Sequence, residues 1–337
     1  MDINKVKHCV IKTFKISLIV LLCFLFSSFL CSCNRKQYGT TTSNNTSSEN
    51  YMHKTISIGN EERTYSVYIH QNNTPQPSMP LVIVLHGLGE TGDDMRELTL
   101  RGFDKLADKE NFIVVYPDGF DKMWNDGPDV YNIAGKKTNI NDVTFISSLI
   151  DEMYSQYKID KKRVYVTGIS NGGEFTHLLA FKLTDKITAI APLAGYMVNN
   201  LVDNNKPSSP IPVLMIHGTD DKLVPWDGKE FKSEKLSGRD VLPFEETVKY
   251  WVNFDGCSTS NKTSVVIDSS SSDGTKIIQD TYSGGKNGTE VVSYKIDGGG
   301  HTWPGGLQYL PENRIGKTSK DMDACSVIWE FFKKFSK

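Results

Sequence analysis

The chain has 337 residues, of which 38% are hydrophobic, and its formal net charge is −2 at pH 7. Beyond the N-terminal segment the sequence contains no basic block of the kind that binds nucleic acid or an anionic membrane surface. We therefore expect no nucleic-acid partner, and the small net charge favours a neutral or weakly charged substrate.

The first 33 residues have the features of an export signal. An uncharged apolar run from Ile16 to Leu30 follows four lysines, Lys5, Lys7, Lys12 and Lys15. An apolar run of about fifteen residues is typical of a secretory signal, because a membrane span needs about twenty. The stretch LCSC resembles the lipobox of bacterial lipoproteins, which predicts a lipid anchor on Cys33 of an exported surface or periplasmic protein. An ordinary cleaved signal of a secreted protein and an uncleaved anchor helix are the alternatives.

Two further segments follow the signal. Residues 34–52 are rich in Ser, Thr and Asn, and they contain too few apolar side chains to bury a core, so we predict a disordered tether. Residues 53–337 have the length of a single large α/β domain. Of the six cysteines, only Cys257 and Cys325 lie in this part. They form either one disulfide or two separate buried thiols, and no Cys/His cluster suggests zinc.

The pattern of the domain predicts a parallel sheet. Alternating residues in TISIG and RTYSVYIH predict an entry hairpin. Five apolar runs follow, of the kind found in strands that are buried on both faces: PLVIVLHG, FIVVYPDG, RVYVTGIS, ITAIAPLAG and PVLMIHG. The clearest helical pattern covers 142–157 with Asp142 as its N-cap, and further helices are expected at 171–183 and at the end of the chain. We read 257–288 as a peripheral elaboration before the last core strand, VVSYKI.

This alternation of strands and helices predicts a mostly parallel, doubly wound α/β sheet with helices on both faces. Ligands of such sheets bind at the carboxyl ends of the strands. At that edge each apolar run ends in a polar or glycine-rich loop, among them HGLGETGDD, TGISNGG and HGTDDKLVP.

The stretch TGISNGGEF matches the G-x-S-x-G nucleophile elbow around Ser170. A side chain at 168 or 172 would collide with the neighbouring strand and helix, which explains glycine at both positions. The turn also places the Ser170 hydroxyl at a helix N-terminus, where developing negative charge is favoured. The alternative is a glycine-rich turn with an incidental serine, and the strand before it and the helix after it argue against that reading.

A serine nucleophile needs a base and a carboxylate that orients the base, and in α/β hydrolases these follow in the order Ser, acid, His. The apolar run PVLMIHG ends in HGTDD, which supplies Asp220 and Asp221, and the last strand ends in GGGHTWPGG, which supplies His301. The other histidines lie in the signal, on edge strands, inside a helix or in HG pairs that brace loops: His8, His53, His70, His86, His177 and His217. We therefore predict His301 as the base.

The third requirement is a pair of N–H groups for the oxyanion. One is the backbone N–H of Asn171, the residue after the nucleophile, and the other is expected from Leu88 in the HGLG loop. Flanking glycines would let that loop approach a substrate, although a plain tight turn would also require glycine.

Together the motifs HGLGETGDDM, YPDG with Trp124, GISNGGEFTHLLA, PVLMIHGTDDKLVPW and GGGHTWPGG resemble the extracellular poly(3-hydroxybutyrate) depolymerase and feruloyl or acetylxylan esterase group of α/β hydrolases. The resemblance extends from about residue 63 to about residue 335. It implies the α/β-hydrolase fold, Ser170 as nucleophile, His301 as base and Asp221 as acid, with Asp220 as the alternative. No cofactor and no metal is implied.

The chain departs from this family at two places. Many members have methionine after SNGG where this chain has Glu174, a change that is structural or makes the acyl pocket more polar. In many members the cysteine at the position of Cys257 forms a disulfide, and here the stretch ahead of the last core strand has no partner cysteine, which puts that disulfide in doubt.

Three tryptophans, Trp124, Trp226 and Trp303, lie in loops at the active edge. We predict that their rings bind sugar or ferulate, with packing of the loops as the alternative.

The resulting expectation is an exported, monomeric serine esterase. We expect it to hydrolyse feruloyl or acetyl esters on plant cell-wall polysaccharide or oligosaccharide, because a tethered, exported esterase can act on released oligosaccharides at the cell surface. Poly(3-hydroxybutyrate) or its oligomers are the alternative substrate. A non-catalytic binding protein and a peptidase on the same scaffold are the rival classes, and the presence of all three triad residues argues against the first.

Overall fold

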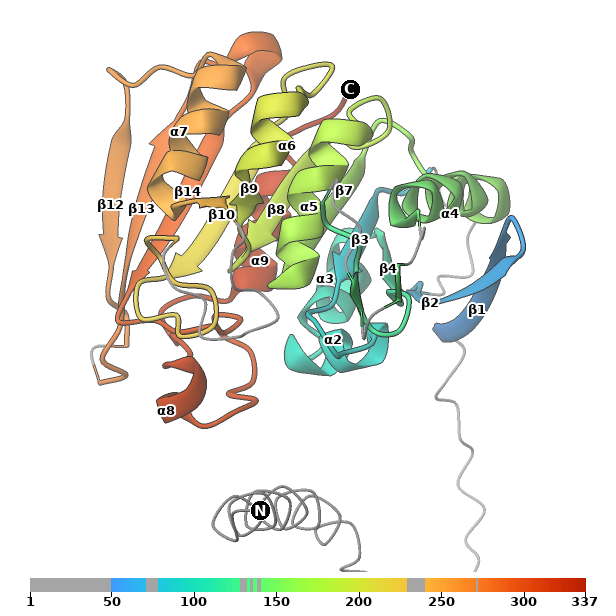
Figure 1. Cartoon of the computed structure of the whole chain (residues 1–337), viewed down its shortest axis with the longest axis horizontal. Coiled ribbons are helices and arrows are strands. Elements are labelled where there is room, and N and C mark those ends of the chain that lie inside the picture. The colour runs from blue at the N-terminus through green and yellow to red at the C-terminus, as the bar shows by residue number, and fades with distance from the viewer. Residues whose placement is uncertain are drawn as a thin grey trace, which may run out of the picture. The chain divides into compact units, whose positions relative to one another are not determined.

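In the computed structural model the chain folds into a ten-stranded sheet with helices on both faces (Figure 1). The structure describes residues 50–70, 78–127, 132–133, 136–137, 141–228, 240–270 and 272–337. The predicted signal, the predicted lipid anchor at Cys33 and most of the predicted tether lie outside the described residues. Within these ranges no helix has the length and apolar character needed to cross a membrane.

The sheet begins with the predicted hairpin, in which β1 (Tyr51–Ile58) and β2 (Glu61–Tyr68) pair antiparallel. The order of strands is β1-β2-β4-β3-β7-β8-β10-β14-β13-β12. Its central six strands are parallel to one another: β3 (Leu81–Leu85), β4 (Ile113–Pro117), β7 (Val164–Ile169), β8 (Ala189–Leu193), β10 (Val213–Gly218) and β14 (Val291–Asp297). All residues of the first five are buried, as their continuous apolar runs predict.

The segment that we interpreted as a peripheral elaboration extends the sheet at its edge. Strands β12 (Thr263–Ile267) and β13 (Lys276–Tyr282) pair antiparallel, and β13 pairs antiparallel with β14. A 3-10 turn at Lys286–Gly288 leads into β14. Two small sheets lie apart from the main one, and they pair β5 (Asn132–Ile133) with β6 (Lys136–Lys137) and β9 (Met197–Val198) with β11 (Val241–Leu242).

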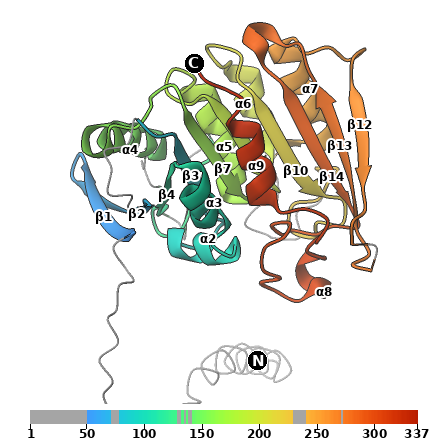
Figure 2. The same ribbon diagram turned by 180° about the vertical axis from the view of Figure 1, so that it is seen from behind.

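Helices cover each face of the sheet. One face carries α4 (Asp142–Tyr157), α5 (Asn171–Lys182), α6 (Asn199–Asn204) and α7 (Phe244–Asp255) (Figure 1). The opposite face carries α2 (Gly92–Leu98), α3 (Gly102–Glu110) and α9 (Ala324–Phe332) (Figure 2). The short α8 (Glu312–Ile315) lies in the loop region beyond the ends of the strands. Apolar side chains on the two faces form two separate buried clusters.

The two cysteines of the domain belong to different clusters. Cys257 is buried on the α7 face and Cys325 on the α9 face, and both are free thiols. The disulfide alternative is therefore wrong, because the sheet separates the two side chains.

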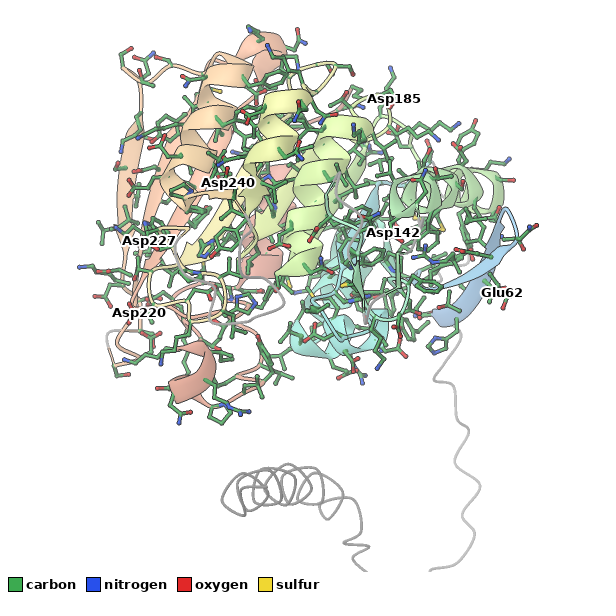
Figure 3. All side chains as sticks on the ribbon, viewed as in Figure 1. Glu62, Asp142, Asp185, Asp220, Asp227 and Asp240 are labelled. Carbon is green, nitrogen blue, oxygen red and sulfur yellow. The ribbon has the colours of Figure 1, made fainter. Side chains whose placement is uncertain are left out.

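The start of α4 differs from the prediction. Asn141, not Asp142, is the N-cap, and its side chain accepts a hydrogen bond from Thr144 N at 2.9 Å. The Asp142 carboxylate, labelled in Figure 3, instead lies 2.7 Å from the Arg63 guanidinium. It also accepts a hydrogen bond from Asn125 N at 2.8 Å. A buried carboxylate without a cation destabilises the fold more than the lack of this side-chain cap destabilises the helix.

We predict that Arg63→Ala lowers the free energy of unfolding by about 3 kcal/mol, because it leaves the buried Asp142 carboxylate without its cation. Urea unfolding followed by tryptophan fluorescence measures the change. The matched control is Arg101→Ala, which removes an exposed guanidinium paired with Glu97, four residues earlier in the chain. Such exposed pairs contribute little. Equal losses of stability in the two variants would contradict the role given to the buried pair.

Candidate active site

Ser170 occupies a strained turn between β7 and α5. Its φ and ψ are 57° and −125°, a conformation that costs a residue with a side chain and persists only where packing enforces it. The packing is visible at the two flanking glycines. A Cβ at Gly172 would lie 2.5 Å from His86 O, and one at Gly168 would lie 2.7 Å from the Gly172 backbone. The collisions expected from the sequence are therefore present in the structure.

Asp221 and His301 meet at the carboxyl ends of β10 and β14. The imidazole Nδ1 lies 2.7 Å from Asp221 Oδ2, and both side chains are buried. The other carboxylate oxygen, Oδ1, accepts hydrogen bonds from the backbone N–H groups of Leu223 at 2.9 Å and Val224 at 2.7 Å. Three donors thus orient this carboxylate. Because Nδ1 donates to Asp221, Nε2 of His301 is the nitrogen left to accept a proton.

Asp220 has a different environment from Asp221. Its side chain is exposed near α8 (Figure 3), and its contact is a 3.4 Å hydrogen bond from Thr219 Oγ1. Its backbone N–H donates to Gly299 O at 2.8 Å. The structure therefore brings Asp221, and not Asp220, to the imidazole.

The backbone holds His301 in place. Its N–H donates to Ile315 O at 2.6 Å, and its carbonyl accepts a hydrogen bond from the Tyr309 hydroxyl at 3.1 Å. The backbone of His301 is thus fixed from two directions, although it lies in a glycine-rich loop.

One cavity of about 440 Å³ collects four of the predicted site residues: Leu88, Ser170, Asn171 and His301. Apolar side chains form much of its wall, namely Leu98, Met123, Ile169, Leu223, Val224 and Leu310. Such a concave, largely apolar space with a few polar groups is typical of a small-molecule site. Among the residues that the structure describes, no group of three or more His, Cys, Asp and Glu side chains is placed to hold a metal ion.

The two residues predicted for the oxyanion differ in exposure. Asn171 is the first residue of α5, so its backbone N–H has no partner within the helix. Leu88 is 51% exposed, and its loop is held by hydrogen bonds from Gly89 N to Lys122 O at 2.8 Å and from Gly87 N to Glu90 Oε2 at 3.0 Å.

The HG-pair histidines brace these loops, as the sequence predicts. Gly119 N donates to His86 Nε2 at 2.8 Å, so the proton is on Nδ1, which donates to Gly87 O at 2.7 Å. His217 Nε2 donates to Val224 O at 2.8 Å and thereby supports the Asp221 loop. Burial lowers the pKa of both imidazoles, which is consistent with neutral, structural histidines.

The prediction of an aromatic binding surface is wrong for two of the three tryptophans. Trp124 is 0% exposed, stacks on Phe175 at 5.1 Å between centroids, and donates from Nε1 to His86 O at 3.0 Å. Trp303 is 1% exposed and packs edge-on against Phe103 at 6.1 Å. Neither lines the cavity, because each ring buries its large apolar surface in the core.

Trp226 is partly buried and packs against Phe244 at 4.5 Å between centroids. The Lys295 ammonium lies 5.2 Å from the centre of its ring. Trp226 is not among the residues that line the cavity. Its loop continues into residues outside the described ranges.

Sequence reasoning missed Asp126 and the side chain of Asn171. Asn171 joins the loop after β4 to α5, since its Nδ2 donates to Asp126 Oδ2 at 2.6 Å and its Oδ1 accepts from Trp124 N at 2.8 Å. Both Asp126 and Glu174 line the cavity. The sequence feature that could have identified Asp126 is the polar loop YPDGFDKMWND at the active edge, in which Asp126 follows Trp124 by two positions.

Several known proteins are similar to this chain. Residues 63–206 match the family model described as Esterase PHB depolymerase. The chain is 26% identical over 283 residues to the predicted esterase NocK of Nocardia uniformis subsp. tsuyamanensis, which covers 82% of this chain and 80% of that one.

Two fungal enzymes match over shorter regions. The bifunctional acetylxylan esterase/xylanase XynS20E of Neocallimastix patriciarum is 33% identical over 164 residues, which is 49% of this chain and 22% of that enzyme. Feruloyl esterase B of Piromyces equi is 29% identical over 205 residues, which is 58% of this chain and 35% of that enzyme. The chain thus spans well under half the length of these two enzymes.

A solved structure shows the same fold. The crystal structure of a thermostable esterase has a TM-score of 0.52 and 16% identity, and the match covers 86% of this chain and 64% of that chain. The predicted fold class, an α/β-hydrolase fold with a mostly parallel sheet flanked by helices, is confirmed.

We predict that Gly172→Ala lowers the free energy of unfolding by about 2 kcal/mol, because the added methyl group meets rigid backbone of β3 and its loop. Thermal and urea unfolding measure the loss. Gly87→Ala is the matched control, since its Cβ would meet only side-chain atoms at 3.2 Å or more. A Gly172→Ala protein as stable as this control would show that the turn tolerates a side chain.

Proposed function

We propose, from the premise that this chain belongs to the Esterase PHB depolymerase family of carboxylic ester hydrolases, that it acts as a serine esterase with Ser170, His301 and Asp221 as its catalytic triad. The observation that carries the proposal is the 2.7 Å hydrogen bond between His301 and Asp221, with His301 and Ser170 on the wall of one cavity.

The proposed reaction has two halves. Ser170 Oγ attacks the ester carbonyl carbon while its proton passes to His301 Nε2. The backbone N–H groups of Leu88 and Asn171 stabilise the oxyanion, and His301 returns the proton to the leaving alcohol. Water then attacks the acyl-enzyme by the same route and releases the acid. Asp221 stays ionised, orients the imidazole and stabilises its protonated form.

For the substrate, we propose feruloyl or acetyl esters on plant cell-wall polysaccharide or oligosaccharide. The support is the similarity to proteins named acetylxylan esterase/xylanase and feruloyl esterase. A cavity of about 440 Å³ has room for an acyl group of either size. Esters of short hydroxyalkanoic acids, as in poly(3-hydroxybutyrate) oligomers, are the second candidate. The carboxyl groups of Asp126 and Glu174 in the cavity wall favour this candidate.

We also propose that the enzyme is exported and anchored through a lipid on Cys33. The support is the sequence of the first 33 residues. Metabolic labelling with a radioactive fatty acid tests this, and label that persists in Cys33→Ala would contradict it.

We predict that Asp221→Asn lowers kcat/KM for p-nitrophenyl acetate by about 10⁴-fold, because the imidazole loses the carboxylate that orients and stabilises it. Asp220→Asn is the neighbouring control and changes kcat/KM by less than about twofold, since its side chain is exposed and lies away from the imidazole. Steady-state kinetics of the two variants decide between the aspartates. A large loss in Asp220→Asn alone would overturn the assignment.

The substrate class is tested by comparing the release of ferulate and acetate from arabinoxylan with the release of 3-hydroxybutyrate from polymer film and soluble oligomers. We expect faster release from arabinoxylan. Release of 3-hydroxybutyrate alone would replace the leading candidate by the second. Turnover of p-nitrophenyl acetate without turnover of any of these materials would reject both substrates and leave the esterase chemistry intact.

A further inference from the structure

Three carboxyl groups line the cavity, and the proposed mechanism uses none of them: Glu90, Asp126 and Glu174. Glu90 has a structural partner, because its Oε2 accepts the Gly87 N–H at 3.0 Å and so holds the HGLG loop. Asp126 and Glu174 differ, since their side chains are hydrogen-bonded to each other. They are 2% and 7% exposed, yet both reach the cavity wall. A buried pair of acids beside a nucleophile is costly and calls for a role.

The protein holds this pair with fixed donors. Asn171 Nδ2 donates to Asp126 Oδ2 at 2.6 Å, and the Tyr196 backbone and the Asn171 side chain donate to Glu174. Two ionised carboxylates in contact repel strongly, so one proton remains between them. Burial first, and then the neighbouring Asp126, raise the pKa of Glu174 well above its ordinary value. A hydrogen bond between two carboxyl groups requires one proton, so the bonded pair carries one proton and a single negative charge.

The pair lies close to the reacting centre. Glu174 is four residues after Ser170 in α5, and helical side chains lean toward the N-terminus of their helix, which here is Ser170. A carboxyl group one helical turn away is within reach of a hydroxyl on the second or third carbon of an acyl chain.

Sheet order places the pair on the acyl side of the scissile bond. Asp126 follows β4 and His301 follows β14, and these strands lie on opposite sides of β7, which carries Ser170. The leaving alcohol must lie next to His301 to receive its proton. The acyl group therefore extends away from β14, toward the Asp126 loop.

We propose that Asp126 and Glu174 form the polar floor of the acyl subsite, where they favour a short acyl group with a hydroxyl near the ester carbonyl over its hydrocarbon analogue of the same shape, and reject acyl groups that carry a carboxylate. This inference rests on the proposed serine-esterase chemistry of Ser170. A hydroxyl donates a hydrogen bond to the carboxyl pair, while Leu98, Met123 and Ile169 contact the hydrocarbon part of the chain.

An anionic acyl group meets the negative charge of the pair, and among the described residues that line the cavity none on that side is a cation. Lys222 also lines the cavity, but it follows β10, on the His301 side of the site. Its Nζ donates to Glu312 O at 3.0 Å.

The test compares shape-matched methyl esters by their kcat/KM in a pH-stat assay. Methyl 3-hydroxybutanoate is paired with methyl 3-methylbutanoate, in which a methyl group replaces the hydroxyl. Monomethyl succinate is paired with methyl 4-methylpentanoate, in which an uncharged isopropyl group replaces the carboxylate. We expect the wild type to prefer the hydroxylated ester about tenfold and to disfavour the anionic ester by a larger factor.

Three variants assign these preferences to the pair. The double variant Glu174→Leu with Asp126→Asn removes the charge and most of the acceptors, so both preferences fall about tenfold. Glu174→Gln keeps a donor to Asp126 and the single charge, so it retains both preferences within about threefold. Asp220→Asn changes an exposed carboxyl group outside the cavity and leaves both ratios as in the wild type.

The outcomes separate the two proposals. Absence of turnover of every ester, by wild type as well as by variants, rejects the esterase and this inference together. Ester turnover without a hydroxyl preference in the wild type, or preferences that survive in the double variant, overturn the inference alone. If the double variant does not fold, the ratios of the wild type and of Glu174→Gln still test the inference. Loss of the hydroxyl preference in Glu174→Gln would contradict it, because this variant keeps the single charge of the pair.

Discussion

The close contact between the turn at Ser170 and strand β3 is the constraint on which the rest of the site depends. Gly168 and Gly172 leave no space for a Cβ, so α5 starts directly against the backbone of Leu85 and His86. This packing enforces the positive φ of Ser170. It also joins Ser170, the proposed nucleophile, and the HGLG loop into one rigid unit. Hydrogen bonds of His86, Trp124 and Asn171 extend this unit to the loop after β4. Ser170, both proposed oxyanion residues and Asp126 are therefore positioned by one connected set of loops.

The proposed acid and base, Asp221 and His301, are positioned by a second unit. The ends of β10 and β14 are parallel neighbours, and their loops are joined by hydrogen bonds from Asp220 N to Gly299 O at 2.8 Å and from Gly298 N to Thr219 Oγ1 at 2.9 Å. Because the backbone of Asp220 is used in this junction, the next residue turns its carboxylate toward His301. Backbone pairing thus explains why two adjacent aspartates have such different surroundings.

The sequence predicted the parts of this structure that depend on local pattern. Buried strands were found because parallel strands that are covered on both faces are continuous apolar runs, and Ser170 was found because a tight turn leaves a glycine signature. It did not predict long-range partners. The local pattern predicts Asp142 as a helix cap, because its buried partner, Arg63, is 79 positions earlier in the chain. It predicts Trp124 and Trp303 as binding residues, because position in a loop does not reveal which way a ring points. The Asp126–Glu174 contact joins the loop after β4 to α5, so no local sequence pattern predicts it.

Covalent labelling of Ser170 tests the central claim most directly. The protein is treated with diethyl p-nitrophenyl phosphate, an ester analogue that phosphorylates activated serines, and the site of the adduct is located by peptide mass spectrometry. The account predicts one adduct per chain, on Ser170, with labelling slowed by several orders of magnitude when His301 is replaced by Ala. An adduct on another residue, or labelling of Ser170 that is equally fast without the imidazole, would contradict it.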